Sequence, residues 1–105
     1  MDVLRRQGYA GLEKGEVMER QNISEELIEA AITKLREGLK YRLAQKGYGS
    51  FSSKHEILGI VTEEYHELVE AVHAGAMGDV SAELGDLAVA AVFGFACMDS
   101  GNVDW

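Results

Sequence analysis

The 105-residue chain contains no proline, and this absence restricts its fold more than any other sequence feature. Proline is the residue that interrupts helices most strongly, whereas glutamate, alanine and leucine, which are plentiful here, favour them. The twelve glycines are then the main breaks between helical segments. These features predict an all-α fold and give little support to strands.

The chain is long enough for one domain, and we expect a single domain over residues 1–105. Residues 1–20 combine closely spaced glycines with mixed charges and weak periodicity, which predicts a weakly structured N-terminal arm. Apolar residues then recur at helical spacing in three segments. The expected helices run from Ser24 to Lys46, from Ser53 to Ala74, and from Asp79 or Ser81 to Met98 or Asp99.

Capping signals support these boundaries. Asn22 with Glu25, and Ser53 with Glu56, have the spacing of a capping box at the start of a helix. Gly75 is expected to end the second helix.

The third predicted helix is apolar on every side beyond Leu87. Such a helix must be covered on all faces, yet the chain offers only two other long helices. Small residues would permit close helix approach, namely Ala88, Ala90, Ala91 and Gly94. We therefore expect a homo-dimer or a higher oligomer such as a tetramer, assembled as a four-helix-type bundle.

Charge and composition narrow the partners and the compartment. The formal net charge of −8 argues against binding to duplex nucleic acid. The apolar run from Leu87 to Met98 is too short to cross a bilayer, so no membrane association is expected. Cys97 is the single cysteine, and we see no signal peptide pattern at the N-terminus, so we expect a cytoplasmic protein.

Two pairs of carboxylates carry the functional signal: Glu64 with Glu67, and Glu83 with Asp86. Residues three apart share a helix face, and a short antiparallel connection would bring the two pairs opposite each other. Four acids in a partly apolar cleft repel one another unless they are protonated or bind a cation. Because oxygen ligands favour hard ions such as Mg²⁺ or Mn²⁺, the sequence predicts a metal site and phosphate chemistry.

The position of Glu64 distinguishes it from ordinary surface acids. It falls within the apolar stripe of the second predicted helix, which includes Tyr65 and Val72, whereas Glu67 falls at the margin. Other acids of this helix follow a solvated flank, namely Glu56, Glu63 and Glu70. An ionised carboxylate on a buried stripe is costly unless something compensates it, and a bound cation would do so.

The same residues carry a family resemblance. Residues 63–68, Glu-Glu-Tyr-His-Glu-Leu, and residues 82–87, Ala-Glu-Leu-Gly-Asp-Leu, resemble the signatures of MazG-like nucleotide pyrophosphohydrolases. These belong to an all-α NTP pyrophosphatase superfamily that includes dimeric dUTPases and phosphoribosyl-ATP pyrophosphatase. The resemblance covers about half the chain, from Ser53 to Met98.

The resemblance implies an activity and a set of site residues. Glu64, Glu67, Glu83 and Asp86 would bind Mg²⁺, for which Mn²⁺ could substitute. A ribo- or deoxynucleoside triphosphate would react with water to give the nucleoside monophosphate and pyrophosphate, in a role that would remove unwanted nucleotides. Glu67 is the favoured candidate for the base, although the sequence alone does not separate a base from a ligand.

The chain departs from longer family members, which commonly continue into another helix with Asn or basic residues near the substrate. No Lys or Arg follows Lys54 here. A cation that binds phosphate must therefore come from Lys54, from the first helix, from the N-terminal arm or from another subunit. The bases of the first helix are expected to be mostly solvated, with one or two able to reach a phosphate.

Other readings of the chain remain open. The rival function is a non-catalytic helical interaction or regulatory module of the same fold, and a third is metal binding without catalysis. Glu63 with His66, and Glu70 with His73, match the E-x-x-H element of di-iron bundles, but all four residues lie on one outer helix face. Solvated side chains are the better interpretation of these pairs.

Overall fold

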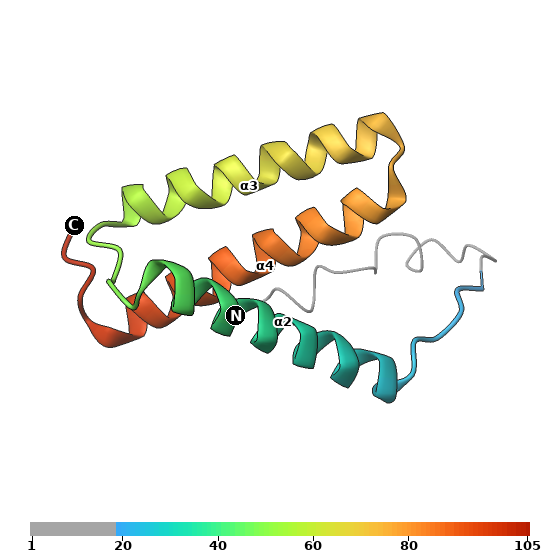
Figure 1. Cartoon of the computed structure of the whole chain (residues 1–105), viewed down its shortest axis with the longest axis horizontal. Helices are drawn as coiled ribbons and strands as arrows, with labels where there is room; N and C mark the ends of the chain where they lie inside the picture. Colours follow the sequence, from blue (N-terminus) through green and yellow to red (C-terminus); the bar gives the residue numbers. More distant parts are fainter. Residues whose placement is uncertain (1–18) are drawn as a thin grey trace.

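The computed structural model describes residues 19–105, in which every regular element is an α-helix. These helices are α2 (Glu25–Lys46), α3 (Lys54–Ala74) and α4 (Met77–Ser100) (Figure 1). The prediction of an all-α fold with three main helices is confirmed. The predicted N-terminal arm lies, apart from residues 19 and 20, outside the described residues.

Helix α2 begins after Ser24, whose hydroxyl accepts a hydrogen bond from the Leu27 backbone N–H at 3.2 Å. The predicted cap at Asn22 was therefore wrong by two residues. Ser24 has the extended backbone of an N-cap and directly precedes the first helical residue, so its hydroxyl reaches an amide that the helix leaves unpaired. The helix ends at Gly47, where φ is +85°.

Helix α3 begins as the sequence predicts. The Ser53 hydroxyl accepts a hydrogen bond from the Glu56 N–H at 3.0 Å, and the Glu56 carboxylate accepts one from the Ser52 N–H at 2.8 Å. Two backbone N–H groups at the start of the helix thus find side-chain acceptors, as in a capping box. Gly75 ends the helix in the left-handed conformation that glycine adopts without strain, as predicted.

Helix α4 begins earlier than predicted. It follows Ala76, which makes no side-chain cap, so the predicted start at Asp79 or Ser81 was wrong. Asp79 lies instead in the first turn, where its charge favours the helix N-terminus. The helix ends at Ser100, just beyond the predicted end, and Gly101 follows with φ +78°.

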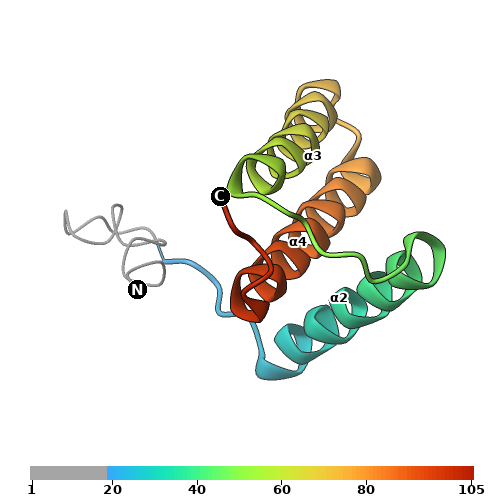
Figure 2. The ribbon, with the colours of Figure 1, turned by 90° about the vertical axis from the view of Figure 1, so that its left-hand side faces the viewer.

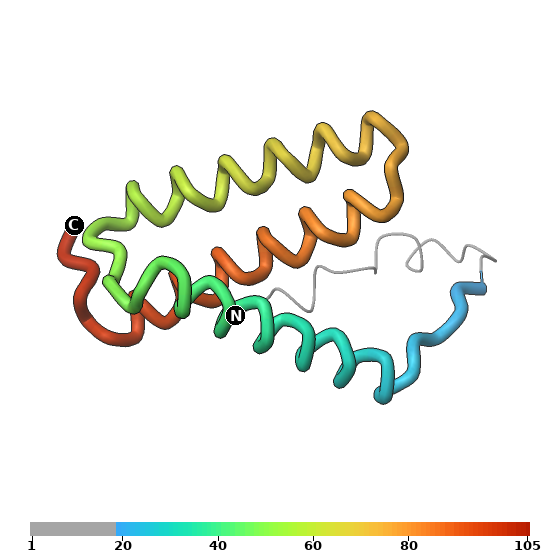
Figure 3. The backbone as a smooth tube through the Cα atoms, viewed as in Figure 1, coloured from blue at the N-terminus to red at the C-terminus, as the bar shows by residue number. Residues whose placement is uncertain are grey.

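Helix α4 is the centre of the fold. It packs against both α3 and α2, whereas α2 and α3 do not pack on each other within the described part of the chain. Figure 2 shows α4 between the other two helices, and α3 with α4 forms an antiparallel hairpin. The C-terminal residues return to the start of α3 (Figure 3), where the Asp104 N–H donates a hydrogen bond to the backbone carbonyl oxygen of Ser52 at 3.1 Å.

Small side chains set the distance between the helices. The buried hydrophobic residues of the described chain are Ala71, Val89, Ala90 and Cys97. Gly94 is also buried, and a Cβ atom at this position would lie 3.1 Å from the Ile57 Cγ2 of α3. Ala90 and Gly94, which the sequence suggested for close helix approach, therefore pack within the chain.

The outer faces of the hairpin remain apolar and exposed. Tyr65 and Val72, predicted on the inner stripe of α3, are more than half exposed, because among the helices of residues 19–105 only α4 packs on α3. On α4, Leu84, Phe95 and Met98 are also more than half exposed. Within residues 19–105, α4 alone is long and apolar enough to cross a membrane, a property it shares with the core helices of bundles.

The close contact at Gly94 predicts a specific effect on stability. Gly94→Val should lower the free energy of unfolding by about 1 to 3 kcal/mol, because the added methyl groups collide with Ile57. Gly59→Val is the matched control, since a Cβ atom there meets nothing within 4 Å. Thermal and urea unfolding measure both variants, and equal stability of the two would contradict the packing described for the hairpin.

Candidate metal centre

Glu64 is the most buried carboxylate of the described chain. It lies on the face of α3 that packs against α4 and is 9% exposed. Its Oε2 atom is buried and has no hydrogen-bond partner. The sequence pattern placed Glu64 within the buried stripe, and the structure confirms this position. A buried carboxylate oxygen without a partner is costly, which points to a bound ligand that is not part of the protein chain.

Two acids of α4 face Glu64. Glu83, Asp86 and Glu64 each offer one carboxylate oxygen, and these three oxygens all lie within 4.8 Å of one another. Glu83 Oε2 is also buried without a hydrogen-bond partner. The three-residue spacing puts Glu83 and Asp86 on one face of α4, and the antiparallel hairpin brings that face to Glu64.

Glu67 lies at the edge of this cluster. It is exposed and is not one of the three residues whose oxygens converge. Its carboxylate is nevertheless close enough to raise the pKa of both Glu64 and Glu83. The structure thus brings three of the four predicted ligands together and places the fourth beside them. Metal binding by these residues stays a prediction.

The electrostatics of the cluster follow from this crowding. Burial is the main cause that raises the pKa of Glu64, followed by the nearby Glu67 and Asp86 carboxylates, while Arg42 opposes the rise. Burial likewise raises the pKa of Glu83 first, and the Glu67, Asp86 and Asp79 carboxylates add to it. Proximity of like charges therefore disfavours full ionisation of the cluster.

Arg42 joins the cluster from α2. One of its guanidinium nitrogens (NH2) lies 3.3 Å from Asp86 Oδ1, which is the only ion pair within residues 19–105. Sequence reasoning allowed a base of this helix to reach the site but did not single out Arg42. The available signal was its place beside Leu39 and Leu43 at the edge of the apolar stripe, whereas Lys40 points away from that stripe.

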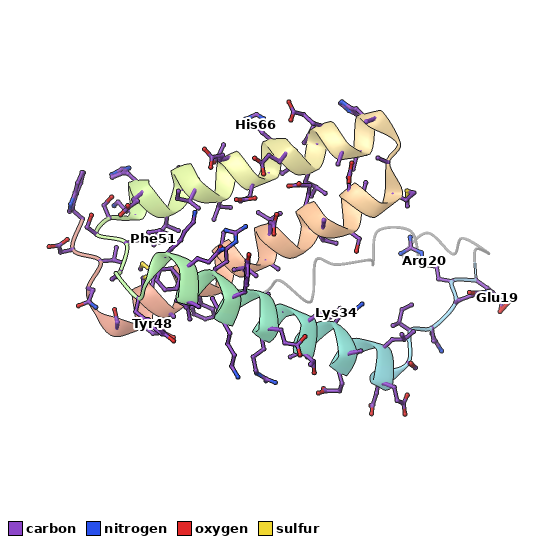
Figure 4. All side chains as sticks on the ribbon, in the orientation of Figure 1. Glu19, Arg20, Lys34, Tyr48, Phe51 and His66 are labelled. Atoms are coloured by element: carbon purple, nitrogen blue, oxygen red, sulfur yellow. The ribbon has the colours of Figure 1, made fainter. Side chains whose placement is uncertain are left out.

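A cleft of about 170 Å³ adjoins the cluster. Its walls are mostly apolar, and Arg42 and Lys46 are its two cationic residues. Phe51, which Figure 4 labels between α2 and α3, packs edge to face against Phe93 with 5.2 Å between the ring centroids. Arg42 both lines the cleft and pairs with Asp86, so this side chain connects the cleft to the carboxylates.

The remaining candidates lie elsewhere. Lys54 is the first residue of α3, ten residues before Glu64 and thus about 15 Å away along the helix, so one chain does not bring it to the carboxylates. His66 lies on the outer side of α3 (Figure 4) and is exposed. The other acids and the histidine of the solvated flank are exposed as predicted, namely Glu56, Glu63, Glu70 and His73.

The cluster fits a hard divalent cation. Its donors are carboxylate oxygens, the ligands that Mg²⁺ and Mn²⁺ favour. Two of its buried oxygens lack any other partner, and their crowding is unfavourable without a positive charge. Arg42 supplies only one such charge, from the side of Asp86.

Comparison with known proteins agrees with this geometry. Residues 52–104 match the sequence model of the MazG nucleotide pyrophosphohydrolase domain, a range that contains both carboxylate pairs. No curated protein matches the chain. No solved structure matches it either.

The raised pKa values predict how the stability of the metal-free protein depends on pH. Because the folded state holds protons on Glu64 and Glu83 more tightly than the unfolded state does, stability should increase as the pH falls from neutral toward their ordinary pKa of 4.5. Glu64→Gln should raise the melting temperature near pH 7 and flatten this dependence. Thermal unfolding in a chelator, across this pH range, measures both effects.

The exposed neighbour Glu63 provides the matched control for this measurement. Glu63→Gln removes the same charge from the same helix but should keep the pH dependence of the unmodified chain. If the stability of the unmodified chain and of Glu63→Gln instead rose with pH, that result would contradict the crowding of the three carboxylates.

Proposed function

Since this chain belongs to the MazG family, we propose that it is a nucleoside triphosphate pyrophosphohydrolase that requires Mg²⁺, with Mn²⁺ able to substitute. A nucleoside or deoxynucleoside triphosphate and water would give the monophosphate and pyrophosphate, by cleavage between the α and β phosphates. The observation that carries the proposal is the buried, unpartnered oxygen of Glu64 opposite Glu83 and Asp86, within the residues that match the family.

Glu64, Glu83 and Asp86 would hold the cation, and Glu67 would join them from the edge of the cluster. When bound, the cation neutralises phosphate charge and lowers the pKa of coordinated water. The buried Oε2 atoms of Glu64 and Glu83 are shielded from competing water on one side of the site. The antiparallel hairpin fixes the separation of the two acidic pairs before substrate arrives, so little reorganisation is needed.

Glu67 is the candidate base of this reaction. It is exposed at the mouth of the cluster, where substrate water has access, whereas Glu64 is buried. In this role its carboxylate accepts a proton from the attacking water, and the developing hydroxide attacks the α-phosphorus while the bond from this atom to the bridging oxygen breaks and pyrophosphate leaves. The same carboxylate lies close enough to Glu64 and Glu83 to raise the pKa of both, so it would stand beside a cation that they held.

The cleft beside the cluster is the candidate site for the rest of the nucleotide. Its apolar walls suit a ring, and Arg42 and Lys46 add positive charge. Its volume of about 170 Å³ is below the roughly 300 to 1,000 Å³ of most small-molecule sites. One chain therefore encloses only part of a nucleotide, and another subunit, for example through its Lys54, would complete the enclosure.

A homo-dimer or tetramer is part of the proposal. On α4, Leu84, Phe95 and Met98 share one face at spacings of eleven and three residues, and on α3, Leu58, Tyr65 and Val72 repeat every seven. These two exposed stripes lie on the same side of the antiparallel hairpin, away from the face that α2 covers. Two hairpins joined through these stripes would form a four-helix bundle.

We also propose a cytoplasmic enzyme that removes unwanted nucleotides. Cys97 is buried as a free thiol, which suits a reducing compartment. The net charge of −8 remains unfavourable for duplex nucleic acid, whereas a free nucleotide can approach as a cation complex.

The exposed apolar stripe of α4 predicts how one added charge changes the oligomeric state. Phe95→Glu places a carboxylate in the centre of the exposed stripe of α4 and should convert the oligomer to a monomer with its helicity retained. Ala44→Glu, at an exposed position on α2, should leave the mass unchanged. Light scattering coupled to size-exclusion chromatography decides, and a monomer before any substitution would rule out this assembly.

The activity is tested with a panel of ribo- and deoxynucleoside triphosphates and Mg²⁺, with monophosphate and pyrophosphate measured as products. Glu64→Gln should lower kcat by about 100-fold or more, because the cation loses its most buried ligand, while the circular dichroism stays helical. Glu63→Gln is the matched control and should retain turnover. Release of orthophosphate instead of pyrophosphate would contradict the cleavage position.

The same experiment separates the rival functions. A non-catalytic interaction or regulatory module would release no product, and neither Mg²⁺ nor Glu64→Gln would change a metal-dependent property. A protein that binds metal without catalysis would gain thermal stability from Mn²⁺ but would cleave none of the nucleotides.

A further inference from the structure

Arg42 is the one residue that belongs both to the cleft and to the carboxylate cluster. Its guanidinium lies 3.3 Å from Asp86 Oδ1, and the two side chains are 33% and 41% exposed. Water therefore screens this ion pair, and an exposed pair of this kind is worth little to stability. Arg42 can leave Asp86 at small cost.

The Arg42 guanidinium and a bound divalent cation would compete for the Asp86 carboxylate. Asp86 is also one of the three acids whose oxygens converge. An Asp86 carboxylate that faces a divalent cation attracts the guanidinium less, and the two positive charges repel each other.

The chemistry of arginine suits the alternative partner. Its planar fork of donors matches phosphate oxygens, and its side chain is long enough to turn from Asp86 toward the cleft that it lines. Lys46 lies one helical turn further along the edge of the same cleft. Since no Lys or Arg follows Lys54, α2 supplies such a cation at this cluster within residues 19–105.

We propose that Arg42 is a phosphate-binding residue that exchanges between two partners: Asp86 in the metal-free protein, and a nucleotide phosphate in the loaded complex. The proposal rests on the function proposed above. Its consequence is positive coupling, because a phosphate that draws Arg42 away leaves Asp86 free for the divalent cation. Cation and nucleotide then bind together better than either does alone.

The test measures two affinities of the full chain that should change in opposite directions. In Arg42→Gln, Mn²⁺ alone should bind about two- to fivefold more tightly, since its competitor at Asp86 is gone. In the presence of Mn²⁺, a nucleotide with a non-hydrolysable α,β-methylene bridge should bind about tenfold more weakly or worse, since a charged hydrogen-bond donor is lost. Isothermal titration calorimetry measures both.

Two further variants make the test specific. Arg42→Lys keeps the charge without the planar fork, so its affinity for the analogue should lie between those of the wild type and Arg42→Gln. Lys40→Gln removes the same charge from an exposed position on the other side of α2 and should change neither affinity.

A purely structural role for Arg42 predicts a different pattern. Arg42→Gln would then lower the melting temperature and leave the affinity for the analogue unchanged, and this result would overturn the proposal. Weaker binding of Mn²⁺ alone would overturn it as well. These affinities need no turnover, so a chain that binds Mn²⁺ and the analogue without cleaving nucleotides would refute the proposed reaction but still decide the role of Arg42.

Discussion

The burial of one carboxylate on the seam between α3 and α4 is the constraint on which the site depends. Glu64 is 9% exposed, and it faces two further acids rather than a base. In a bundle without a ligand this arrangement is unfavourable, because burial and like charge both oppose ionisation. The fold sustains it because Gly94 lets the hairpin close tightly on Ile57, away from the cluster, so that packing holds the acids together. Unfavourable burial of a charged group is typical of functional sites.

Helix α4 carries both a part of this site and an exposed apolar surface. One side of α4 carries Glu83 and Asp86 and packs on its neighbours, while the opposite side carries an exposed apolar stripe. The cleft, which lies mainly between α2 and α4, is small and is connected to the cluster by Arg42. We propose that another copy of the chain covers the apolar stripe, whereas the cleft lies on the side of α4 that α2 covers, so its enclosure is a separate requirement.

The sequence was sufficient for the helices and for the inward direction of Glu64, because helical periodicity reports which residues share a face. It failed where the outcome depends on neighbours that the pattern does not identify. Tyr65 satisfies the same periodicity as Glu64 but is exposed, since α4 covers a narrower face than expected. The choice of Ser24 over Asn22 as a cap depended on local backbone geometry. The pairing of Arg42 with Asp86 depended on how α2 crosses α4, which no motif records.

Diffraction from crystals grown with Mn²⁺, at a wavelength where manganese scatters anomalously, tests the central claim most directly. The account predicts an anomalous peak about 2.0 to 2.6 Å from carboxylate oxygens of Glu64, Glu83 and Asp86, with the helices arranged as they are here. A crystal in which Mn²⁺ binds elsewhere while these three carboxylates turn toward bulk solvent would contradict it.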